Sequence, residues 1–466
     1  MKSERKFSGI EFYALAFGLF LGVAILKFGN PVILDGKIIP PASPAEFWND
    51  PWPTHWANWF LLPLALTGAA LAFSKKVYWP GTKWLWRLPL LWLGWQFLSA
   101  TQTVDATLSS ATLWQFFGCG AGYFLGVFLL GRERTLHWLL IGLLAAFAFC
   151  LVRAINQRLF EFPQSRQMLM EGERASWTNL PPETVLEMKR DDVIITTNGV
   201  DVANPAILAK FAKGRVNGTL VYPNALAGAI LLLFPVSLVL AFISTKRLRP
   251  ALRASVIALT LFLGGAGFFW TGSKLAWLIA MAVGGACLFR LKWPARCKWM
   301  ALTAVLLAGL GIFAVRFHNY FAGGATSAGA RLDYWRAAAQ TTVTHPLFGT
   351  GPGTFQRPYA RLKSPEAEMA RLTHNDYLEQ FLDSGIAGGI FYATWILLAL
   401  TSAGRKIWNA GSPLSFAILA GLLGWFLQGI GEFGLYVPAL AWTAFTLLGG
   451  LPGLAGNQID KPATAI

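Results

Sequence analysis

One histidine lies where a proton acceptor could form. His374 follows Thr373, a residue type that favours the N-cap of a helix, and Asp376 lies three residues after the threonine. Gly385 stands where such a helix would end. We therefore expect His374 in the first helical turn, where the positive end of the helix dipole disfavours the imidazolium ion. A neutral imidazole can accept a proton from a substrate, although the spacing alone favours the alternative of a surface histidine on a loop helix.

Three cations stand at positions where they could bind an anion. Arg215 ends a long polar segment just before an apolar run, Lys274 lies in a very short connection between two apolar runs, and Arg331 begins a helical stretch. A charge beside a membrane that topology does not require points to an anionic ligand. The structural alternatives are an interfacial anchor for Arg215, a snorkelling side chain for Lys274, and a solvated helix face for Arg331.

Glu432 is a further candidate for the same chemistry. It lies in a tight turn at 431–434 and is the only acidic residue between Asp383 and Asp460. A carboxylate there could orient a base or bind a cation, and the alternative is a plain turn residue.

The glycine-rich turn at 349–353 is a candidate phosphate-binding element. It could cradle a phosphate through its backbone N–H groups. It lacks the Gly-Lys-Ser/Thr ending of a P-loop, which favours a packed turn.

The spacing of the His, Cys, Asp and Glu residues indicates neither a metal site nor disulfide bonds. No arrangement of His, Cys, Asp and Glu resembles a metal site, so we expect neither a metal nor another cofactor. The four cysteines lie in or beside apolar runs without the paired spacing of a zinc site or a disulfide framework. They are Cys119, Cys150, Cys287 and Cys297.

The elements that must position these residues are set by an unusually apolar composition. Of the 466 residues, 55% are hydrophobic and only 13% are charged. A soluble core could not bury so much apolar surface, so the lipid bilayer is the expected environment. The formal net charge of +16 comes from basic residues scattered between apolar runs, with no stripe or cluster of the kind that binds nucleic acid.

About twelve apolar runs are long enough to form transmembrane helices. The expected fold class is therefore all-α, a polytopic integral membrane protein with about twelve transmembrane helices and two long periplasmic loops. The runs lie at 9–28, 57–73, 84–99, 110–131, 135–156, 220–244, 251–270, 274–291, 299–317, 385–403, 413–430 and 435–451.

The distribution of Lys and Arg predicts the orientation. Every second short connection is basic, and basic connections tend to lie in the cytoplasm, so both termini are expected there. The residues that carry this pattern are Lys2, Arg5, Lys6, Lys75, Lys76, Lys83, Arg132, Arg134, Lys246, Arg247, Arg249, Arg253, Arg290, Lys292, Arg296, Lys298, Arg405, Lys406 and Lys461.

The same pattern divides the chain into five segments. We expect an N-terminal membrane bundle at 1–156, a first long periplasmic loop at 157–215, central spans at 216–317, a large periplasmic loop with His374 at 318–384, and C-terminal spans at 385–466. Within the two loops, helices are expected at 205–213, after the cap-and-proline pair Asn204-Pro205, at 331–342 and at 374–383.

Several of these residues resemble a known family. The stretches 330–335 and 345–355, and His374-Asn375 with Gly388 downstream, are similar to the O-antigen ligase and polymerase superfamily (the Wzy-C group), most of all to its ligases. The ligase pattern of His, then Asn, Ser or Gln, nine residues and Gly-x-x-Gly-Thr is matched except that Gly389 replaces the threonine. The stretches 214–218 and 222–224 resemble the Arg-x-x-Gly and Pro-Asn of the family, and Lys274 stands where its Ser-Arg-Gly has arginine.

The resemblance implies a multi-pass enzyme of the bacterial inner membrane with its active face in the periplasm. It would move a glycan from an undecaprenyl-diphosphate carrier to a hydroxyl of an acceptor, either lipid-A core or another glycan or protein. A repeat-unit polymerase for O-antigen or exopolysaccharide, or a protein O-oligosaccharyltransferase of the same superfamily, is the alternative. A membrane transporter fits less well, because the chain shows no internal repeat.

The resemblance also assigns roles to the candidate residues. His374 would activate the acceptor, and Arg215, Lys274, Arg331 and Asn375 would bind substrate. Fixed cations suit this reaction because the leaving diphosphate gains charge as the glycosidic bond breaks. A lysine lacks the bidentate fork of an arginine, so Arg316 is a candidate to replace the family arginine at the position of Lys274.

Overall fold

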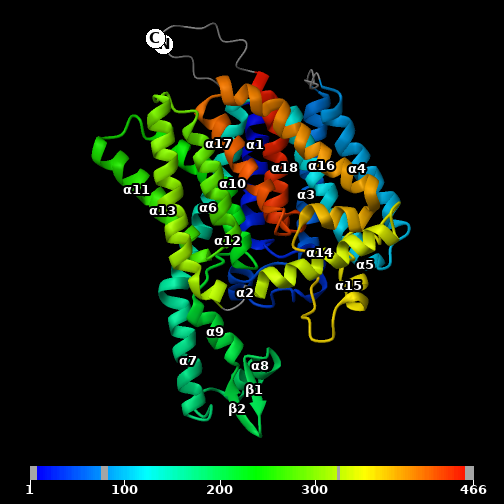
Figure 1. Cartoon of the computed structure of the whole chain (residues 1–466), viewed down its shortest axis with the longest axis vertical. Coiled ribbons are helices and arrows are strands. Elements are labelled where there is room, and N and C mark those ends of the chain that lie inside the picture. Colours follow the sequence, from blue (N-terminus) through cyan, green and yellow to red (C-terminus); the bar gives the residue numbers. More distant parts are fainter. Residues whose placement is uncertain (1–7, 75–81, 323–325, 457–466) are drawn as a thin grey trace.

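The computed structural model describes residues 8–74, 82–322 and 326–456. Figure 1 shows a bundle of long helices with a smaller part projecting from one end. The bundle consists of α1 (Gly9–Lys27), α3 (Thr54–Phe73), α4 (Trp84–Ala100), α5 (Ala106–Leu125), α6 (Glu133–Asn156), α10 (Pro223–Ser244), α11 (Pro250–Thr271), α12 (Lys274–Leu288), α13 (Ala295–Ala322), α16 (Asp376–Ala410), α17 (Pro413–Gln428) and α18 (Pro438–Gly456).

These helices confirm the expectation of an all-α polytopic membrane protein. Within the described residues, nine helical segments are long and apolar enough to cross a bilayer. Of the other bundle helices, α12 and α17 are shorter apolar helices, and α4 has 17 residues. Helices satisfy every backbone N–H and C=O group within the bilayer, which explains why the apolar runs adopt this structure. The basic residues Lys2, Arg5, Lys6, Lys75, Lys76 and Lys461 lie outside the described residues.

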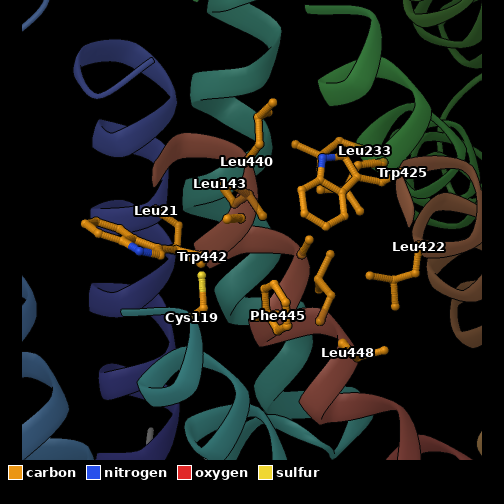
Figure 2. Close-up of a cluster of buried hydrophobic side chains, with 14 of the residues drawn as sticks. Leu21, Cys119, Leu143, Leu233, Leu422, Trp425, Leu440, Trp442, Phe445 and Leu448 are labelled. Carbon is orange, nitrogen blue, oxygen red and sulfur yellow. The ribbon is translucent and has the colours of Figure 1, made fainter. Parts of the chain in front are cut away.

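The centre of the bundle is formed by α1, α5, α6, α10, α17 and α18. Figure 2 shows part of the buried cluster there, where Trp442 and Phe445 of α18 lie among leucines of the surrounding helices. Close packing depends on small residues, since a Cβ added to Gly18 would lie 2.1 Å from the carbonyl oxygen of Leu139. Such small residues allow membrane helices to approach at the backbone.

The predicted first loop folds into the projecting part seen at the bottom of Figure 1. Helix α6 continues through η3 (Gln157–Glu161) into α7 (Phe162–Arg174), and α8 (Pro182–Arg190) leads into a hairpin of β1 (Ile194–Thr197) and β2 (Val200–Ala203). Ile194 pairs with Ala203 in this antiparallel hairpin. The predicted helix at 205–213 is α9 (Pro205–Lys213), with the Asn204 side chain accepting a hydrogen bond from the N–H of Ala206.

The second predicted loop lies against the bundle. It contains α14 (Thr326–Thr344), which includes the helix expected at 331–342, and α15 (Gln356–Leu362). The chain before it differs from expectation, because α13 stays helical through Ala322, beyond the predicted end of the span at residue 317. Gly385 interrupts α16 where the helix was expected to end, with φ 69° and ψ −173°.

The remaining elements are short. They are η1 (Val32–Lys37) and α2 (Pro44–Asn49) between α1 and α3, η2 (Gly126–Leu130) after α5, and η4 (Gly434–Tyr436) between α17 and α18. Glu432 lies in the connection between α17 and α18, just before η4. This connection leads directly from the candidate site to the start of α18.

Candidate functional site

A cavity of about 710 Å³ gathers most of the candidate residues. It lies between the starts of α10 and α12, the outer part of α13, the helix α14 and the segment before α16. The predicted residues that line it are Arg215, Lys274, Arg331, His374 and Glu432. Arg316 and Asn375 are not among the lining residues. Five residues chosen from separate parts of the sequence thus share one cavity.

Glu432 is the centre of the polar contacts in this cavity. Its Oε1 accepts hydrogen bonds from Nη2 of Arg331 at 2.5 Å and from Nδ2 of Asn224 at 2.7 Å. Its Oε2 accepts one from the hydroxyl of Tyr222 at 3.1 Å. The Glu432 side chain is only 4% exposed, and a buried carboxylate with a cation and two neutral donors is well compensated. The alternative of a plain turn residue is therefore wrong.

Arg215 is held in place by two hydrogen bonds. Its Nε donates to the carbonyl oxygen of Thr271, and its Nη2 donates to Oδ1 of Asn224, both at 2.7 Å. Burial lowers the pKa of the Arg215 guanidinium, and the negative charge of Glu432 opposes that shift. An arginine stays charged at neutral pH after such a shift. Asn224 therefore links a fixed cation to the carboxylate of Glu432.

Lys274 begins α12 and enters the cavity from another side. Its Nζ lies 3.8 Å from the ring centroid of Tyr320 and 5.4 Å from that of Phe317. Aromatic faces attract a cation without neutralising its formal charge. Arg316 contacts aromatic rings as well, with its Cζ 5.0 Å from the centroid of Phe269. Its predicted role as a substitute for the family arginine has no support in the lining of the cavity.

His374 is positioned just before a helix, which corrects the expectation from sequence. Asn375, and not Thr373, is the N-cap of α16, and its Oδ1 accepts hydrogen bonds from the N–H groups of Tyr377 and Leu378. The Thr373 hydroxyl instead accepts from the N–H of Asn375 at 3.2 Å. Both residue types favour this position, and the backbone decides between them: His374 has φ 54°, which no helical residue adopts.

The start of α16 is fixed to the turn that carries Glu432. The N–H of Asp376 donates to the carbonyl oxygens of Gly429 at 2.7 Å and Glu432 at 3.1 Å. The Asp376 carboxylate accepts from the N–H of Leu435, at 3.1 Å to Oδ1. These tertiary contacts place His374 beside Glu432 and explain why the helix begins at Asp376.

The imidazole of His374 lies between two aromatic rings. Its centroid is 6.0 Å from that of Tyr334, with the planes 27° apart, and 4.7 Å from that of Phe433 in an edge contact. Its Nδ1 lies 3.6 Å from Oε2 of Glu432, a distance too long for a hydrogen bond. This Nδ1 is buried and has no hydrogen-bond partner among the described residues. The ring is thus held in orientation with its side chain still 30% exposed.

Two other predicted features lie outside the cavity. Asn375 uses its side-chain oxygen to cap α16, so its predicted substrate contact remains a prediction. The glycine-rich turn at 349–353 is a packed turn: the N–H groups of Thr350 and Gly351 donate to the carbonyl oxygens of Leu382 and Asp383. Those N–H groups are therefore not free to cradle a phosphate.

Four residues of the site were missed as candidates. Tyr222 and Asn224 donate hydrogen bonds to Glu432, and Tyr334 and Phe433 flank the histidine. Burial raises the pKa of the Tyr334 hydroxyl, and the nearby carboxylate of Glu368 adds to that shift, so this hydroxyl stays neutral. The sequence offered two signals for Asn224: it is a polar residue at the very start of an apolar run, and 222–224 resembles the Pro-Asn of the family.

The fold and the cavity define a polytopic membrane protein with a cationic site and a histidine at one end of its bundle. Residues 259–393 match the sequence family described as O-antigen ligase (Wzy-C), a range that includes Lys274, Arg331 and His374. This match supports the similarity of this part of the chain to the O-antigen ligase superfamily and suggests a membrane enzyme of the ligase or polymerase type. No curated protein matches the chain.

Proposed function

We propose that the protein transfers a glycan from an undecaprenyl-diphosphate carrier to a hydroxyl group of an acceptor, as an O-antigen ligase does, at the periplasmic face of the inner membrane. The observation that supports this most is the convergence of Arg215, Lys274 and Arg331 with His374 in one cavity. Three cations suit a diphosphate, and a histidine beside them suits an acceptor hydroxyl.

The reaction requires one bond to form and one to break. The acceptor oxygen attacks the anomeric carbon of the first sugar, and the electron pair of the bond from that carbon to the phosphate oxygen goes to the diphosphate. The hydroxyl proton passes to the imidazole of His374. Arg215, Lys274 and Arg331 stabilise the charge that develops on the diphosphate, and such preorganised charge is usually the largest single contribution to catalysis.

Glu432 has a supporting role in this proposal. Its carboxylate fixes Arg331 directly and Arg215 through Asn224, so the two guanidinium groups are oriented before substrate binds. It also faces Nδ1 of His374, where a carboxylate stabilises the imidazolium that forms on proton transfer. Catalytic hydrogen bonds are often long in the absence of substrate, and the 3.6 Å separation fits that pattern.

The test is transfer by the purified protein in vesicles. The donor is an undecaprenyl-diphosphate-linked glycan, and the acceptors are rough lipopolysaccharide with only lipid A and core, a second donor molecule, and a secreted acceptor protein. Extension of the lipopolysaccharide supports a ligase of the lipid-A core. Extension of the donor itself would support a polymerase, and glycosylated protein would support an oligosaccharyltransferase. No product with any acceptor, in vesicles where the protein is folded, contradicts the proposal.

A further inference from the structure

A second cavity lies outside the candidate site, between the first turns of α3 and α5. It measures about 560 Å³, and the segment around Pro438 at the start of α18 closes one side. Its lining is polar and aromatic, with His55, Asn58, Ser110, Trp114 and Gln115 among its residues. Within the described residues, no Lys or Arg lines this cavity. The cavity therefore offers hydrogen bonds and aromatic surface without fixed positive charge.

Two features indicate that this cavity is built to bind a polar ligand. The Nδ1 of His55 lies 2.7 Å from Oδ2 of Asp35, and Oδ1 of Asp35 accepts a hydrogen bond from the Thr54 hydroxyl at 2.7 Å, so the imidazole is oriented by its neighbours. The Gln115 side chain is 1% exposed and donates to the carbonyl oxygen of Leu435 at 2.7 Å. Its Oε1 has no hydrogen-bond partner among the described residues, and a buried acceptor in this state is costly unless a ligand donates to it.

A third, apolar cavity of about 330 Å³ continues along the same two helices. On α3 the polar cavity ends at Asn58 and the apolar one begins at Leu62, and on α5 the boundary lies between Gln115 and Phe117. These steps of four and two residues correspond to about 6 Å and about 3 Å along a helix. The rings of Trp114 and Phe117 are in edge contact, with centroids 5.9 Å apart. The two cavities are thus neighbouring parts of one groove.

The groove has the polarity of an amphipathic molecule lying along a membrane helix. Its polar part is at the start of both helices, and its apolar part lies among Leu66, Ala69 and Phe124, deeper in the two candidate membrane spans. A Trp ring beside hydroxyl, amide and imidazole groups suits the apolar face and the hydroxyls of a sugar. Hydrocarbon chains suit the apolar part, since burial of each CH₂ group from water favours binding.

We propose that the groove between α3 and α5 binds a glycolipid, with an uncharged sugar headgroup in the polar cavity and a hydrocarbon tail in the apolar cavity. The absence of Lys and Arg from the described lining of both cavities favours a sugar over a phosphate headgroup. This site is separate from the cavity around Glu432 and does not depend on the function proposed for that cavity.

The glycolipid would lie close to the candidate active site. Glu432 lines one cavity and Pro438 the other, and an extended chain spans at most about 3.5 Å per residue, so their Cα atoms are within about 21 Å. The connection passes through Leu435, which bonds to Gln115 of the groove and to Asp376 at the start of α16. A bound glycolipid therefore contacts the same short segment that positions Glu432.

Photolabelling in nanodiscs of phosphatidylethanolamine and phosphatidylglycerol tests the proposal. The probe is a glucosyl-diacylglycerol with a photoactivatable group in one acyl chain, and a phosphatidylethanolamine with the same acyl chain is the second arm. We expect the glucosyl lipid to label α3 and α5, and unlabelled glucosyl-diacylglycerol to compete. Equal labelling of α3 and α5 by the phospholipid, or no labelling by the glucosyl lipid, overturns the proposal.

Matched variants locate the two parts of the ligand. Trp114→Ala removes the aromatic surface, and Ala69→Phe fills the apolar cavity, so each should reduce labelling about three- to tenfold. Trp59→Ala and Ala70→Phe change residues of α3 outside the groove lining and should leave labelling unchanged. Loss of labelling in all four variants, or in none, overturns the assignment of the groove.

The candidate active site gives an independent comparison. His374→Ala should strongly reduce transfer and leave glycolipid labelling intact, because His374 lines neither part of the groove. If transfer proves unaffected by His374 while the groove variants lose labelling, the glycolipid site stands and the function proposed for the other cavity fails. The melting temperature of each variant is measured alongside, so that a misfolded protein is not mistaken for one that has lost its site.

Discussion

Nδ1 of His374 lies 3.6 Å from Oε2 of Glu432, and the backbone N–H of Asp376 donates to the carbonyl oxygen of the same glutamate. The turn between α17 and α18 therefore holds both the start of α16 and the carboxylate that faces the histidine. Arg331 donates a hydrogen bond to the other oxygen of that carboxylate. The buried carboxylate of Glu432 therefore faces both the candidate proton acceptor, His374, and a cation, Arg331.

Replacement of His374 by alanine should reduce transfer by about 10²- to 10⁴-fold, because a general base contributes a factor of that size. The protein should still fold, since the imidazole is partly exposed and its Nδ1 has no hydrogen bond to lose within the described part of the chain. Initial rates of glycan transfer in vesicles measure the effect. His345→Ala is the matched control, because the side chain of His345 is exposed and, among the described residues, forms a hydrogen bond only with the neighbouring Thr344 hydroxyl. Equal loss in the two variants would argue against a specific role.

Glu432→Gln should reduce transfer about 10- to 100-fold, since it removes the charge that fixes Arg331 and faces His374. If the glutamate acts through the histidine, the substitution should cost much less in a His374→Ala background than alone. A double-mutant cycle on the transfer rate measures this coupling. Strictly multiplicative losses would mean that Glu432 acts only through the arginines.

Substitution of any of the three cations should lower kcat/KM for the lipid-diphosphate donor more than kcat/KM for the acceptor. Arg215→Ala, Lys274→Ala and Arg331→Ala should each lower kcat/KM for the donor by about 10²-fold, as removal of one preorganised charge does at other anionic transition states. Lys274→Arg should stay active, because it restores the residue type that the resemblance expects at this position. The control is Lys213→Ala, a change of an exposed lysine at the end of α9 that lies outside the cavity lining. Kinetics with the donor and acceptor varied in turn separate the two effects.

Chelation by excess EDTA should leave the transfer rate unchanged. Fixed arginine and lysine side chains supply, in this cavity, the positive charge that divalent ions supply in many other phosphate sites. The measurement compares the rate before chelation, after chelation, and after Mg²⁺ is restored. A loss of activity that Mg²⁺ reverses would show that the cations alone do not stabilise the leaving group.

Most of the fold could be predicted because a membrane helix has a simple sequence pattern, a long run of apolar residues. Each of the twelve predicted apolar runs corresponds to a helix, since about 20 apolar residues have few other structures in a bilayer. The ends of helices were less predictable. Helix α6 continues into α7 as far as Arg174 although the residues there are polar, and α13 passes residue 317. Hydropathy detects only the apolar part of a helix, so it does not show where a helix continues into polar residues.

The site could be predicted as a set of residue types but not as a geometry. Arg215, Lys274, Arg331 and His374 were identified by their positions next to apolar runs or a helix start, and all four line the cavity. The central role of Glu432 was not predictable, because its hydrogen-bond partners come from two other segments of the chain, 222–224 and the start of α14. The helix start was misplaced for a similar reason: contacts of Asp376 with residues after α17 choose Asn375 over Thr373 as the cap.

Gly385 is the position where a single methyl group should do the most damage to the scaffold of the site. Its φ of 69° and ψ of −173° lie in a region that only glycine adopts easily, and an added Cβ would lie 2.3 Å from the carbonyl oxygen of Leu347. Gly385→Ala should therefore destabilise the protein by about 1–3 kcal/mol from backbone strain alone, and lower its melting temperature in nanodiscs. Gly265→Ala is the matched control, because that glycine lies within α11 with nothing within 4 Å of its added Cβ. An unchanged melting temperature for Gly385→Ala would mean that α16 can continue through this residue, and that the break is not required to hold the segment before it in place.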